Sequence, residues 1–367
     1  MKCSQKIIKI GVCSTMLLSL TACSSSNDVE AVMDAQEKFG CNTINVYNAG
    51  EYIATDVVPN FEKMYNATVK YDTFDSNETM YTKLLGGSSY DVIIPSDYMI
   101  ERMIQEDMLQ ELNQDQLTNL ADLDPAVVEM RNAYDDGGKY AIPYFWGSVG
   151  IVYDKTQVNE EDIKKLGWDI FKDTQYKGNF FFYDSQRDGF MVAFKALGYS
   201  MNTEDETEIQ AAYDWLKEMN DTMEPAYVTD EVIDGMVQGE KAFALMYSGD
   251  AAYVLSENEN MAWIEPDQGT NIWSDSMVIP ANASCAGLAN EFINYAISYD
   301  VQYANTEAVG YTSVRNDVAD EMSSEEGTYY ENAAYSARKN GSKDEVFHYN
   351  ANLTKALSDL WNKVKVQ

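Results

Sequence analysis

Apolar and polar positions follow two alternating patterns along most of the chain. Short segments such as "TINVYN" (43–48), "ATVKYDTF" (67–74) and "YDVIIPS" (90–96) are rich in β-branched and aromatic residues, which predicts strands. Between them, apolar residues recur at every third or fourth position, as in "TDVVPNFEKMYN" (55–66) and "SNETMYTKLLGG" (76–87), which predicts helices. The second half of the chain repeats this succession. Strands and helices that alternate at this spacing predict an α/β protein with mostly parallel sheets flanked by helices.

The chain is predicted to form two lobes. It has 367 residues, of which 45% are hydrophobic, so it can bury two cores. No long linker rich in proline or glycine separates the halves, which indicates lobes joined by crossing strands rather than independent domains. We expect a first lobe from residues 42–147 plus 275–318, and a second lobe from residues 148–274 plus 319–367.

The N-terminus has the pattern of an export signal. Three lysines precede the apolar segment 10–20, which is too short to span a membrane, and "LTAC" follows, ending at Cys23. Small residues before a cysteine at this place resemble the bacterial lipobox, in which the cysteine is lipidated and becomes the first residue. Residues 1–22 are therefore predicted to be a lipoprotein signal peptide and residues 23–41 a lipid-anchored tether. The alternative is an ordinary signal peptide with an incidental cysteine.

Two further cysteines, Cys41 and Cys285, remain in the predicted mature protein. Outside the cell they can form a disulfide, but the sequence does not give the distance between them. Either they pair, or they are two separate small buried residues.

The charge balance restricts the ligands that the protein can attract. There are 60 acidic residues against 26 Lys and Arg, which gives a formal net charge of −34. Loss of residues 1–22 removes three lysines and no acid, so the mature charge is −37. Nucleic acid is not expected as a partner because it needs basic patches, whereas a cationic ligand is favoured. Most of these carboxylates are expected only to solvate the surface.

Motifs for catalysis or cofactor binding are absent from the sequence. His348 is the single histidine, which excludes metal sites built on clustered histidines. There is no G-x-S-x-G, Walker or G-x-G-x-x-G motif. Among 60 acidic residues, carboxylate pairs of the kind that hydrolyse glycosides arise by chance. We therefore expect no enzyme activity, no cofactor and no metal.

The segment "NIWSDSMVIP" (271–280) combines an aromatic ring with an acid. In a strand, alternate side chains share a face, so Trp273 and Asp275 would lie side by side. Met277 and Ile279 continue that face as ordinary core residues. A flat ring beside a carboxylate suits an ammonium group attached to a methylene chain.

Eight segments stand in register from about residue 43 to the C-terminus: "VYNAGEYIA", "FDSNETMYTKL", "YDVIIPSDYMIERM", "LTNLADLDP", "AIPYFWG", "ALGYSMNTEDETEIQAAY", "WSDSMVIPANA" and "GYTS". Together they resemble the extracytoplasmic spermidine/putrescine-binding proteins that supply ABC importers. The resemblance implies a two-lobed periplasmic-binding-protein fold with the ligand between the lobes, a polyamine as ligand and ABC importer permease subunits as partners. We also expect a monomer, held at the membrane through the lipidated Cys23 that the lipobox pattern predicts.

The same resemblance implies a set of ligand-binding residues, each with a plainer alternative. Asp184 lies as near to a strand end as Asp188 does, while Ser96 and Asp250 could serve only as helix caps. Trp273 could be an ordinary core residue. The implied set is Glu51, Ser96, Tyr98, Asp188, Tyr247, Asp250, Trp273, Asp275 and Tyr311.

Several positions depart from the family pattern and leave the preferred ligand open. Ala49 and Gly50 stand where relatives usually carry Trp and then Ser or Thr, and Ser185 replaces an acid of the spermidine-type relatives. Asp250 adds an acid that those relatives commonly lack. Another organic cation, such as a choline-like amine, or ferric ion therefore remains an alternative on the same fold. A lipid-anchored hydrolase and a surface adhesin or permease scaffold are alternatives of other classes.

Overall fold

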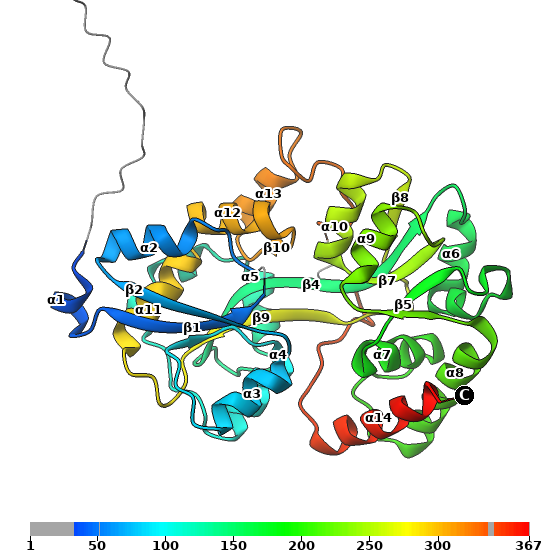
Figure 1. The fold of residues 1–367 in the computed structure, drawn as a ribbon, viewed down its shortest axis with the longest axis horizontal. Helices are drawn as coiled ribbons and strands as arrows, with labels where there is room; N and C mark the ends of the chain where they lie inside the picture. Colours follow the sequence, from blue (N-terminus) through cyan, green and yellow to red (C-terminus); the bar gives the residue numbers. More distant parts are fainter. Residues whose placement is uncertain (1–32, 51, 337–340, 367) are drawn as a thin grey trace, which may run out of the picture.

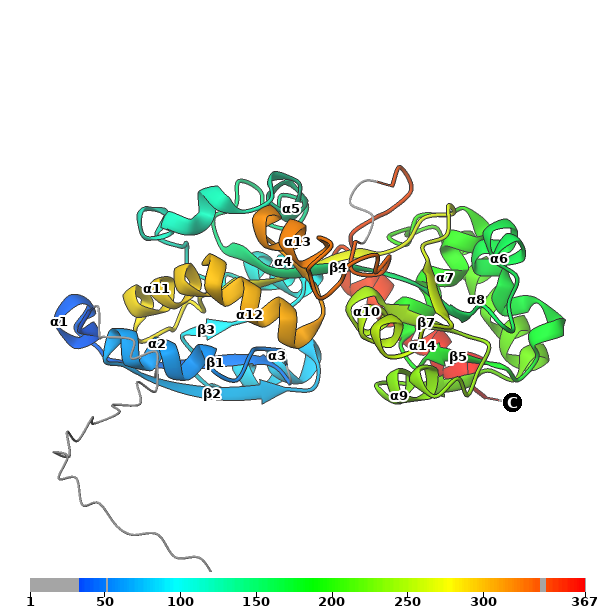
Figure 2. The ribbon, with the colours of Figure 1, turned by 90° about the horizontal axis from the view of Figure 1, so that it is seen from above.

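The computed structural model describes residues 33–50, 52–336 and 341–366, which form two lobes side by side. In Figure 1 the first lobe, with α2, α3 and α11, lies on the left, and the second, with α6, α7 and α8, lies on the right. In Figure 1 the C-terminal helix α14, Ala351–Val364, lies at the lower edge of the second lobe, where it contacts α7 and α8, and Figure 2 shows the same two lobes from above. Predicted signal residues 1–22 and Cys23 lie outside the described residues.

The strands form one sheet that is continuous through both lobes, in the order β2-β1-β3-β9-β4-β7-β5-β6, with β8 and β10 each paired to β4. The outer pairs β1–β2, β1–β3, β5–β6 and β5–β7 are parallel, as the strand–helix alternation predicts. The central strand β4 instead runs antiparallel to its neighbours. The predicted α/β architecture is therefore confirmed, with antiparallel strands added at its centre.

Strands β4, Ala141–Asp154, and β9, Ile272–Val278, carry the chain between the lobes. The first half of β4, residues 141–148, pairs with β9. Its second half pairs with β7 through residues 149–153 and with β8 through 151–154. All 14 residues of β4 are buried, so this strand belongs to both lobes at once.

In the first lobe, helices cover both faces of the sheet. Helix α3 begins with a capping box, in which the Ser76 side chain and the Thr79 side chain each accept a hydrogen bond from the other residue's backbone N–H. The elements of this lobe are α1 (Ala35–Phe39), β1 (Thr43–Ala49), α2 (Val57–Tyr65), β2 (Thr68–Phe74), α3 (Asn77–Leu85), β3 (Val92–Ile93), α4 (Asp97–Gln105), α5 (Pro125–Arg131), α11 (Ala286–Ala296), α12 (Tyr299–Val309), β10 (Thr312–Ser313) and α13 (Asn316–Met322).

The second lobe repeats the layered arrangement with different connections. Its long helix α8 begins after Asp205, whose carboxylate accepts hydrogen bonds from the first turn. The elements are α6 (Glu160–Leu166), β5 (Phe180–Tyr183), α7 (Gln186–Leu197), α8 (Glu206–Met223), β6 (Ala226–Val228), α9 (Glu231–Val237), β7 (Phe243–Tyr247), α10 (Ser248–Glu257), β8 (Met261–Ile264) and α14. Short 3-10 turns span Gln114–Gln116, Thr118–Asp122, Gly167–Lys172 and Thr174–Tyr176.

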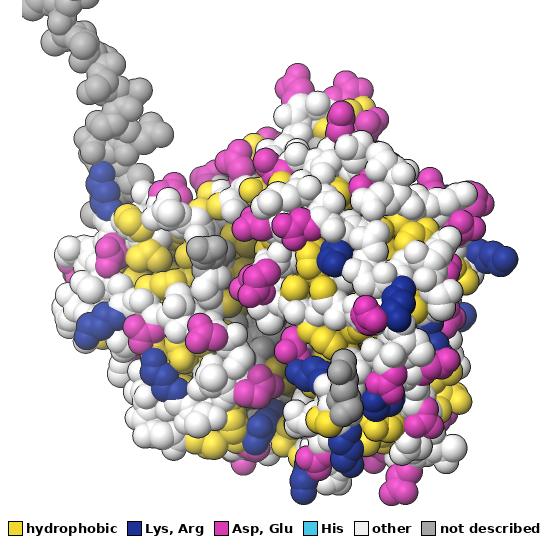
Figure 3. All heavy atoms as spheres, turned by 45° about the vertical axis from the view of Figure 1, so that its right-hand side comes forward, with side chains coloured by type: hydrophobic (Ala, Val, Ile, Leu, Met, Phe, Trp, Pro, Cys, Tyr) yellow, Lys and Arg dark blue, Asp and Glu magenta, His cyan; other side chains and the backbone are white. Residues whose placement is uncertain are grey.

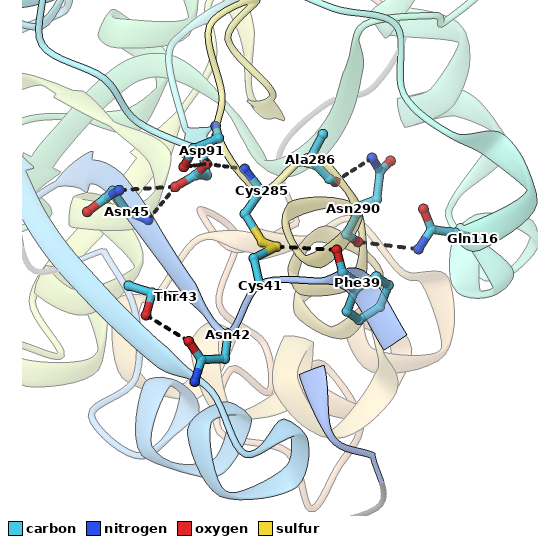
Figure 4. Close-up of a disulfide and its surroundings, with 12 residues drawn as sticks. Phe39, Cys41, Asn42, Thr43, Asn45, Asp91, Gln116, Cys285, Ala286 and Asn290 are labelled. Atoms are coloured by element: carbon cyan, nitrogen blue, oxygen red, sulfur yellow. Dashed lines mark hydrogen bonds between the residues drawn. A yellow bond between two sulfur atoms is a disulfide. The ribbon is translucent and has the colours of Figure 1, made fainter. Parts of the chain in front are cut away.

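A disulfide closes the outer end of the first lobe (Figure 4). Cys41, just before β1, is bonded to Cys285 at the start of α11, across 244 residues of sequence. The buried carboxylate of Asp91 lies beside it and accepts hydrogen bonds from the backbone N–H of Cys285 and from Asn45. The question that the sequence left open is thus answered in favour of pairing.

Candidate functional site

The candidate site is built on β9, at the junction of the two lobes. Trp273 and Asp275 share one face of this strand, as the alternation predicts. Ser274 and Ser276 point to the other face, where both hydroxyls hydrogen-bond to Tyr134. The strand therefore presents the indole and the carboxylate together, on the face where residues of the second lobe meet it.

Aromatic rings from both lobes surround Trp273. Its ring centroid lies 5.0 Å from that of Tyr311 and 6.3 Å from that of Tyr247, in edge-to-face contacts. Tyr247 also stacks on Tyr183 at 4.8 Å, and Tyr52 contacts Tyr311 at 5.7 Å. The junction thus has flat, apolar walls contributed by β5, β7, β9 and the segments that follow β1 and α12.

Two glycines leave room for these rings. A Cβ atom at Gly147, which pairs with Trp273 across β4 and β9, would lie 2.7 Å from the indole. A Cβ atom at Gly249, in the first turn of α10, would lie 2.3 Å from the Tyr311 ring. Both distances are too short for a side chain, so glycine at these positions sets where the rings stand.

Three carboxylates at the junction each accept a hydrogen bond from a tyrosine hydroxyl, and we call them the three acid–tyrosine pairs. Asp188 pairs with Tyr247 (2.8 Å), Asp250 with Tyr311 (3.2 Å), and Asp275 with Tyr52 (2.9 Å). Tyr183 adds a second, longer bond to Asp250 (3.4 Å). The pairs come from both lobes, so negative charge and aromatic surface converge on one place.

The predicted acids and their alternatives differ in burial and in hydrogen-bond partners. Asp188 is only 2% exposed and lies at the junction, whereas Asp184 is exposed and bonds to Trp361 and Lys365 of α14. Asp250 is not a helix cap, because α10 begins at Ser248 and the carboxylate bonds to tyrosine hydroxyls instead. Asp188 and Asp250 are therefore the acids that face the other site residues.

Ser96 and Tyr98 lie at the start of α4 and approach the site from the first lobe. Ser96 occupies the N-cap position without a side-chain cap bond, and it forms a β-bridge with Asp275. The Tyr98 hydroxyl donates to Glu78 at 3.0 Å, and the Tyr98 ring faces Arg187. Between them, the buried Asp97 accepts hydrogen bonds from the backbone N–H groups of Tyr98 and Ser274.

Burial shifts the protonation equilibria of these groups. It raises the pKa of Asp250 to about 6 and that of Asp97 to about 7. Burial also raises the pKa of Asp275, although hydrogen bonds from Ser96 and Tyr52 oppose the shift. For the tyrosines of the three acid–tyrosine pairs, burial and the neighbouring carboxylates hold each pKa well above its ordinary value. The hydroxyls therefore remain donors at any physiological pH.

The site contains residues that the sequence did not single out. Tyr52 adjoins Glu51 in the quoted segment "YNAGEYIA", Tyr183 ends β5, and Arg187 precedes Asp188 on α7. Each is next in sequence to a predicted residue or to a strand end, and proximity of that kind was the only available signal. Glu51 itself lies outside the described residues. The other predicted ligand residues all belong to this one cluster.

Two lobes that are joined by crossing strands, with aromatic rings and carboxylates gathered at their junction, are typical of the class of two-lobed solute-binding proteins. The chain belongs to the bacterial extracellular solute-binding protein family, whose sequence profile matches residues 88–334. The resemblance noted in the sequence is thereby confirmed.

Curated relatives and solved structures agree with this assignment. The spermidine/putrescine-binding periplasmic protein of Escherichia coli is 33% identical over 272 residues, which cover 74% of this chain and 77% of that protein. The crystal structure of a spermidine/putrescine ABC transporter substrate-binding protein from Streptococcus pneumoniae matches with a TM-score of 0.76 and 33% identity, over 88% of this chain and 98% of that one. A Treponema pallidum lipoprotein, at 23% identity and a TM-score of 0.77, shares the fold over 89% of this chain.

In the part of the chain that the structure describes, no helix is long and apolar enough to cross a membrane. Within the same residues, no group of three or more His, Cys, Asp and Glu side chains is arranged to hold a metal ion. Figure 3 shows acidic side chains spread over both lobes of the face in view, with apolar side chains between them.

Proposed function

We propose that this protein captures a polyamine, spermidine or putrescine, outside the cytoplasm and delivers it to an ABC importer. The observation that carries the proposal is the set of three acid–tyrosine pairs around Trp273. A polyamine is a methylene chain with ammonium groups along it, so it needs apolar walls and negative charges in alternation. The spermidine/putrescine-binding relatives from Escherichia coli and Streptococcus pneumoniae support the same ligand class.

In this proposal the ligand lies between the lobes. The ligand-binding residues are Ser96, Tyr98, Asp188, Tyr247, Asp250, Trp273, Asp275 and Tyr311, joined by Glu51. Asp188 and Asp250 belong to the second lobe and Asp275 to the first, so a single polyamine would contact carboxylates from both. Each carboxylate keeps its tyrosine hydroxyl as one partner and has lone pairs left for an ammonium group.

Binding would be coupled to closure of the lobes. Without a ligand, carboxylates brought together at the junction repel one another and favour separation. A cation that contacts both lobes removes this repulsion and favours the closed form, since a ligand shifts an equilibrium only through its differential affinity. The closed form would then dock on the permease subunits. The role is one of capture and release, without catalysis.

We further propose that the protein is a monomer tethered to the membrane through lipidated Cys23. The apolar segment 10–20, the small residues before the cysteine and the polar stretch after it support this. Mass spectrometry of protein from a native membrane fraction is expected to show residues 1–22 removed and Cys23 acylated. Recovery of a mature chain without lipid, cleaved elsewhere, would contradict the anchor.

Thermal melts of the purified protein against a panel of ligands test the main proposal. Polyamines are expected to raise the melting temperature in proportion to the logarithm of their concentration, because they bind the native state. Choline, amino acids and ferric ion are expected to have little effect. A shift with choline alone would favour the other organic cations, and turnover of model glycosides or esters would favour a hydrolase. The absence of a shift with any small molecule would favour an adhesin or scaffold.

A further inference from the structure

The segment of residues 345–349, which leads into α14, is fixed to the second lobe, and we call it the strap. The Glu345 carboxylate forms an ion pair with Lys195 of α7, whose side chain is only 4% exposed. The same carboxylate accepts a hydrogen bond from the backbone N–H of Met201 (3.0 Å). Asn202 donates to the backbone carbonyl of the next strap residue (2.8 Å). The strap is therefore expected to move with the second lobe.

The far end of the strap contacts α4 of the first lobe. Oε2 of Glu101 accepts a 2.7 Å hydrogen bond from the backbone N–H of Tyr349 and lies 3.3 Å from Nδ1 of His348. We call this contact the clasp, and it uses no residue of the three acid–tyrosine pairs. The side chains of Glu101 and His348 are 21% and 46% exposed, so the clasp joins the lobes through groups that still meet solvent.

Negative charges surround His348 in the clasp. The hydrogen bond to Glu101 raises the pKa of His348 above its ordinary value. The fields of Glu101, of Asp97 on the same helix and of Glu345 in the strap act in the same direction, whereas partial burial opposes the rise. On the side of the second lobe, the backbone N–H of His348 donates to Asn202 (2.9 Å), which carries no charge. These surroundings favour the positively charged imidazole.

Two arginines lie beside the strap, and each contacts one of its aromatic rings. The guanidinium carbon of Arg102, in α4, is 5.2 Å from the centroid of the Tyr349 ring. That of Arg187, in α7, is 5.3 Å from the centroid of the Phe347 ring. These contacts involve the neighbours of His348 on either side, so the acids decide the sign of the field at the imidazole.

We infer that the strap is a latch whose clasp stabilises the closed form, whichever ligand it holds, and does so more strongly once His348 is protonated. The inference rests on the proposed capture of a polyamine with closure of the lobes. When the lobes separate, Glu101 must leave Tyr349 and His348, because they belong to different lobes. A proton that binds the closed form more tightly than the open form favours closure. The clasp therefore strengthens as the pH falls through the range in which the imidazole titrates.

Proton NMR of the imidazole tests whether the clasp forms, because His348 is the single histidine of the chain. Glu101→Gln keeps the size of the side chain but removes its charge. In the ligand-free protein, the titration midpoint is expected to be about 0.5 pH unit higher in wild type than in this variant. Saturation with putrescine should raise the wild-type midpoint further, since closure completes the clasp, and should not raise that of the variant.

Stopped-flow release, followed by tryptophan fluorescence, tests the effect on ligand retention. At pH 6.5, Glu101→Gln is expected to release putrescine and spermidine about threefold faster than wild type, by the same factor for both. His348→Gln keeps a neutral hydrogen-bond donor, so it should match wild type at pH 8 and release about threefold faster at pH 6.5. Asp97 and Asp250 titrate in both proteins, so their effects cancel in this ratio.

Glu62→Gln is the matched control. Glu62 lies on α2 of the first lobe and, like Glu101, accepts a hydrogen bond from a backbone N–H, that of Val69 (2.8 Å). Donor and acceptor belong to the same lobe, so closure does not change this bond. The variant is expected to keep the wild-type titration midpoint and release rates.

Equal imidazole midpoints in wild type and Glu101→Gln, with and without putrescine, would overturn the inference, since the clasp would then not form in solution. Faster release of only one of the two polyamines from His348→Gln would also overturn it and would make His348 a ligand contact. In both cases polyamines bind, so the proposed function stands. If no polyamine binds, the proposed function and the effect on release both fail, while unequal ligand-free midpoints would still show that the clasp joins the lobes.

Discussion

The hydroxyl of Tyr247 donates a 2.8 Å hydrogen bond to Oδ2 of Asp188, and the ring of Tyr247 meets Trp273 edge to face across the lobe junction. Replacement of Asp188 by Asn removes the charge while it keeps the size of the side chain. We expect polyamine binding to weaken by about 2–5 kcal/mol, because a buried ion-pair partner is lost. Calorimetric titration with putrescine and spermidine measures this loss.

Asp184→Asn provides the control for that variant. Asp184 is close in sequence but bonds to Trp361 and Lys365 on the surface of the second lobe. Its replacement should leave the affinity for polyamines within twofold of wild type. If Asp188→Asn bound polyamines as well as Asp184→Asn does, Asp188 would have no part in the site.

Binding should weaken as the pH falls through about 6. Burial raises the pKa of Asp250 to about 6, from 3.8 in an unfolded chain, so the folded protein takes up a proton as the pH drops through that value. The ammonium groups of the ligand keep their charge there. A cation binds the ionised carboxylate, and we expect the affinity at pH 5 to be about tenfold lower than at pH 7.5.

The Asp250→Asn variant identifies the group responsible. It should bind polyamines more weakly than wild type at pH 7.5, yet show a smaller change between pH 7.5 and pH 5. Equal affinities of the wild-type protein at the two pH values would show that Asp250 is not an ammonium partner.

Gly249→Ala tests whether the position of Tyr311 matters. The new Cβ atom would lie 2.3 Å from the Tyr311 ring and must displace it. Loss of one aromatic contact to an ammonium group should cost about 0.5–2 kcal/mol of binding free energy. Gly249→Ala combined with Tyr311→Ala should bind no more weakly than Tyr311→Ala alone. Additive losses in that cycle would indicate that Gly249 acts on something other than the ring.

Replacement of both Cys41 and Cys285 by serine should lower the free energy of unfolding by about 2–5 kcal/mol, since the bond closes a long loop. Urea denaturation measures the change. Reduced wild-type protein should unfold at the same urea concentration as the double variant. Polyamine affinity should stay unchanged, because the bond joins the start of β1 to the start of α11, at the end of the first lobe away from the junction (Figure 1). Equal stability of oxidised and reduced wild-type protein would contradict the prediction.

The local pattern predicted the secondary structure well, but not how the centre of the sheet is paired. The capping box at Ser76 and the alternation of Trp273 with Ser274 depend on neighbouring residues alone, so they could be read directly. The antiparallel pairing of β4 with β9 joins residues that are more than 120 positions apart in the sequence, so the pattern within a short segment cannot predict it. The same limit applies to Cys41 and Cys285, whose distance depends on the whole first lobe.

A resemblance supplied most positions of the candidate site, whereas the residues that only the fold brings to the same place were not singled out in the sequence. Asp188 and Asp250 were separated from their alternatives only by exposure and by hydrogen bonds to tyrosines. Arg187 was missed because its partner Tyr98 lies in the other lobe. Arg187 also carries a charge of the same sign as the expected ligand, which gives no reason in the sequence to place it in the site.

The disulfide between Cys41 and Cys285 has a consequence for biogenesis. Members of an extracellular family leave a cytoplasm in which thiols are kept reduced. Until translocation is complete, the newly made chain lacks the covalent bond that links the segment before β1 to the start of α11 in the first lobe. Part of the stability of the protein is thus added only after export, and the precursor that the secretion machinery handles is the form more readily unfolded.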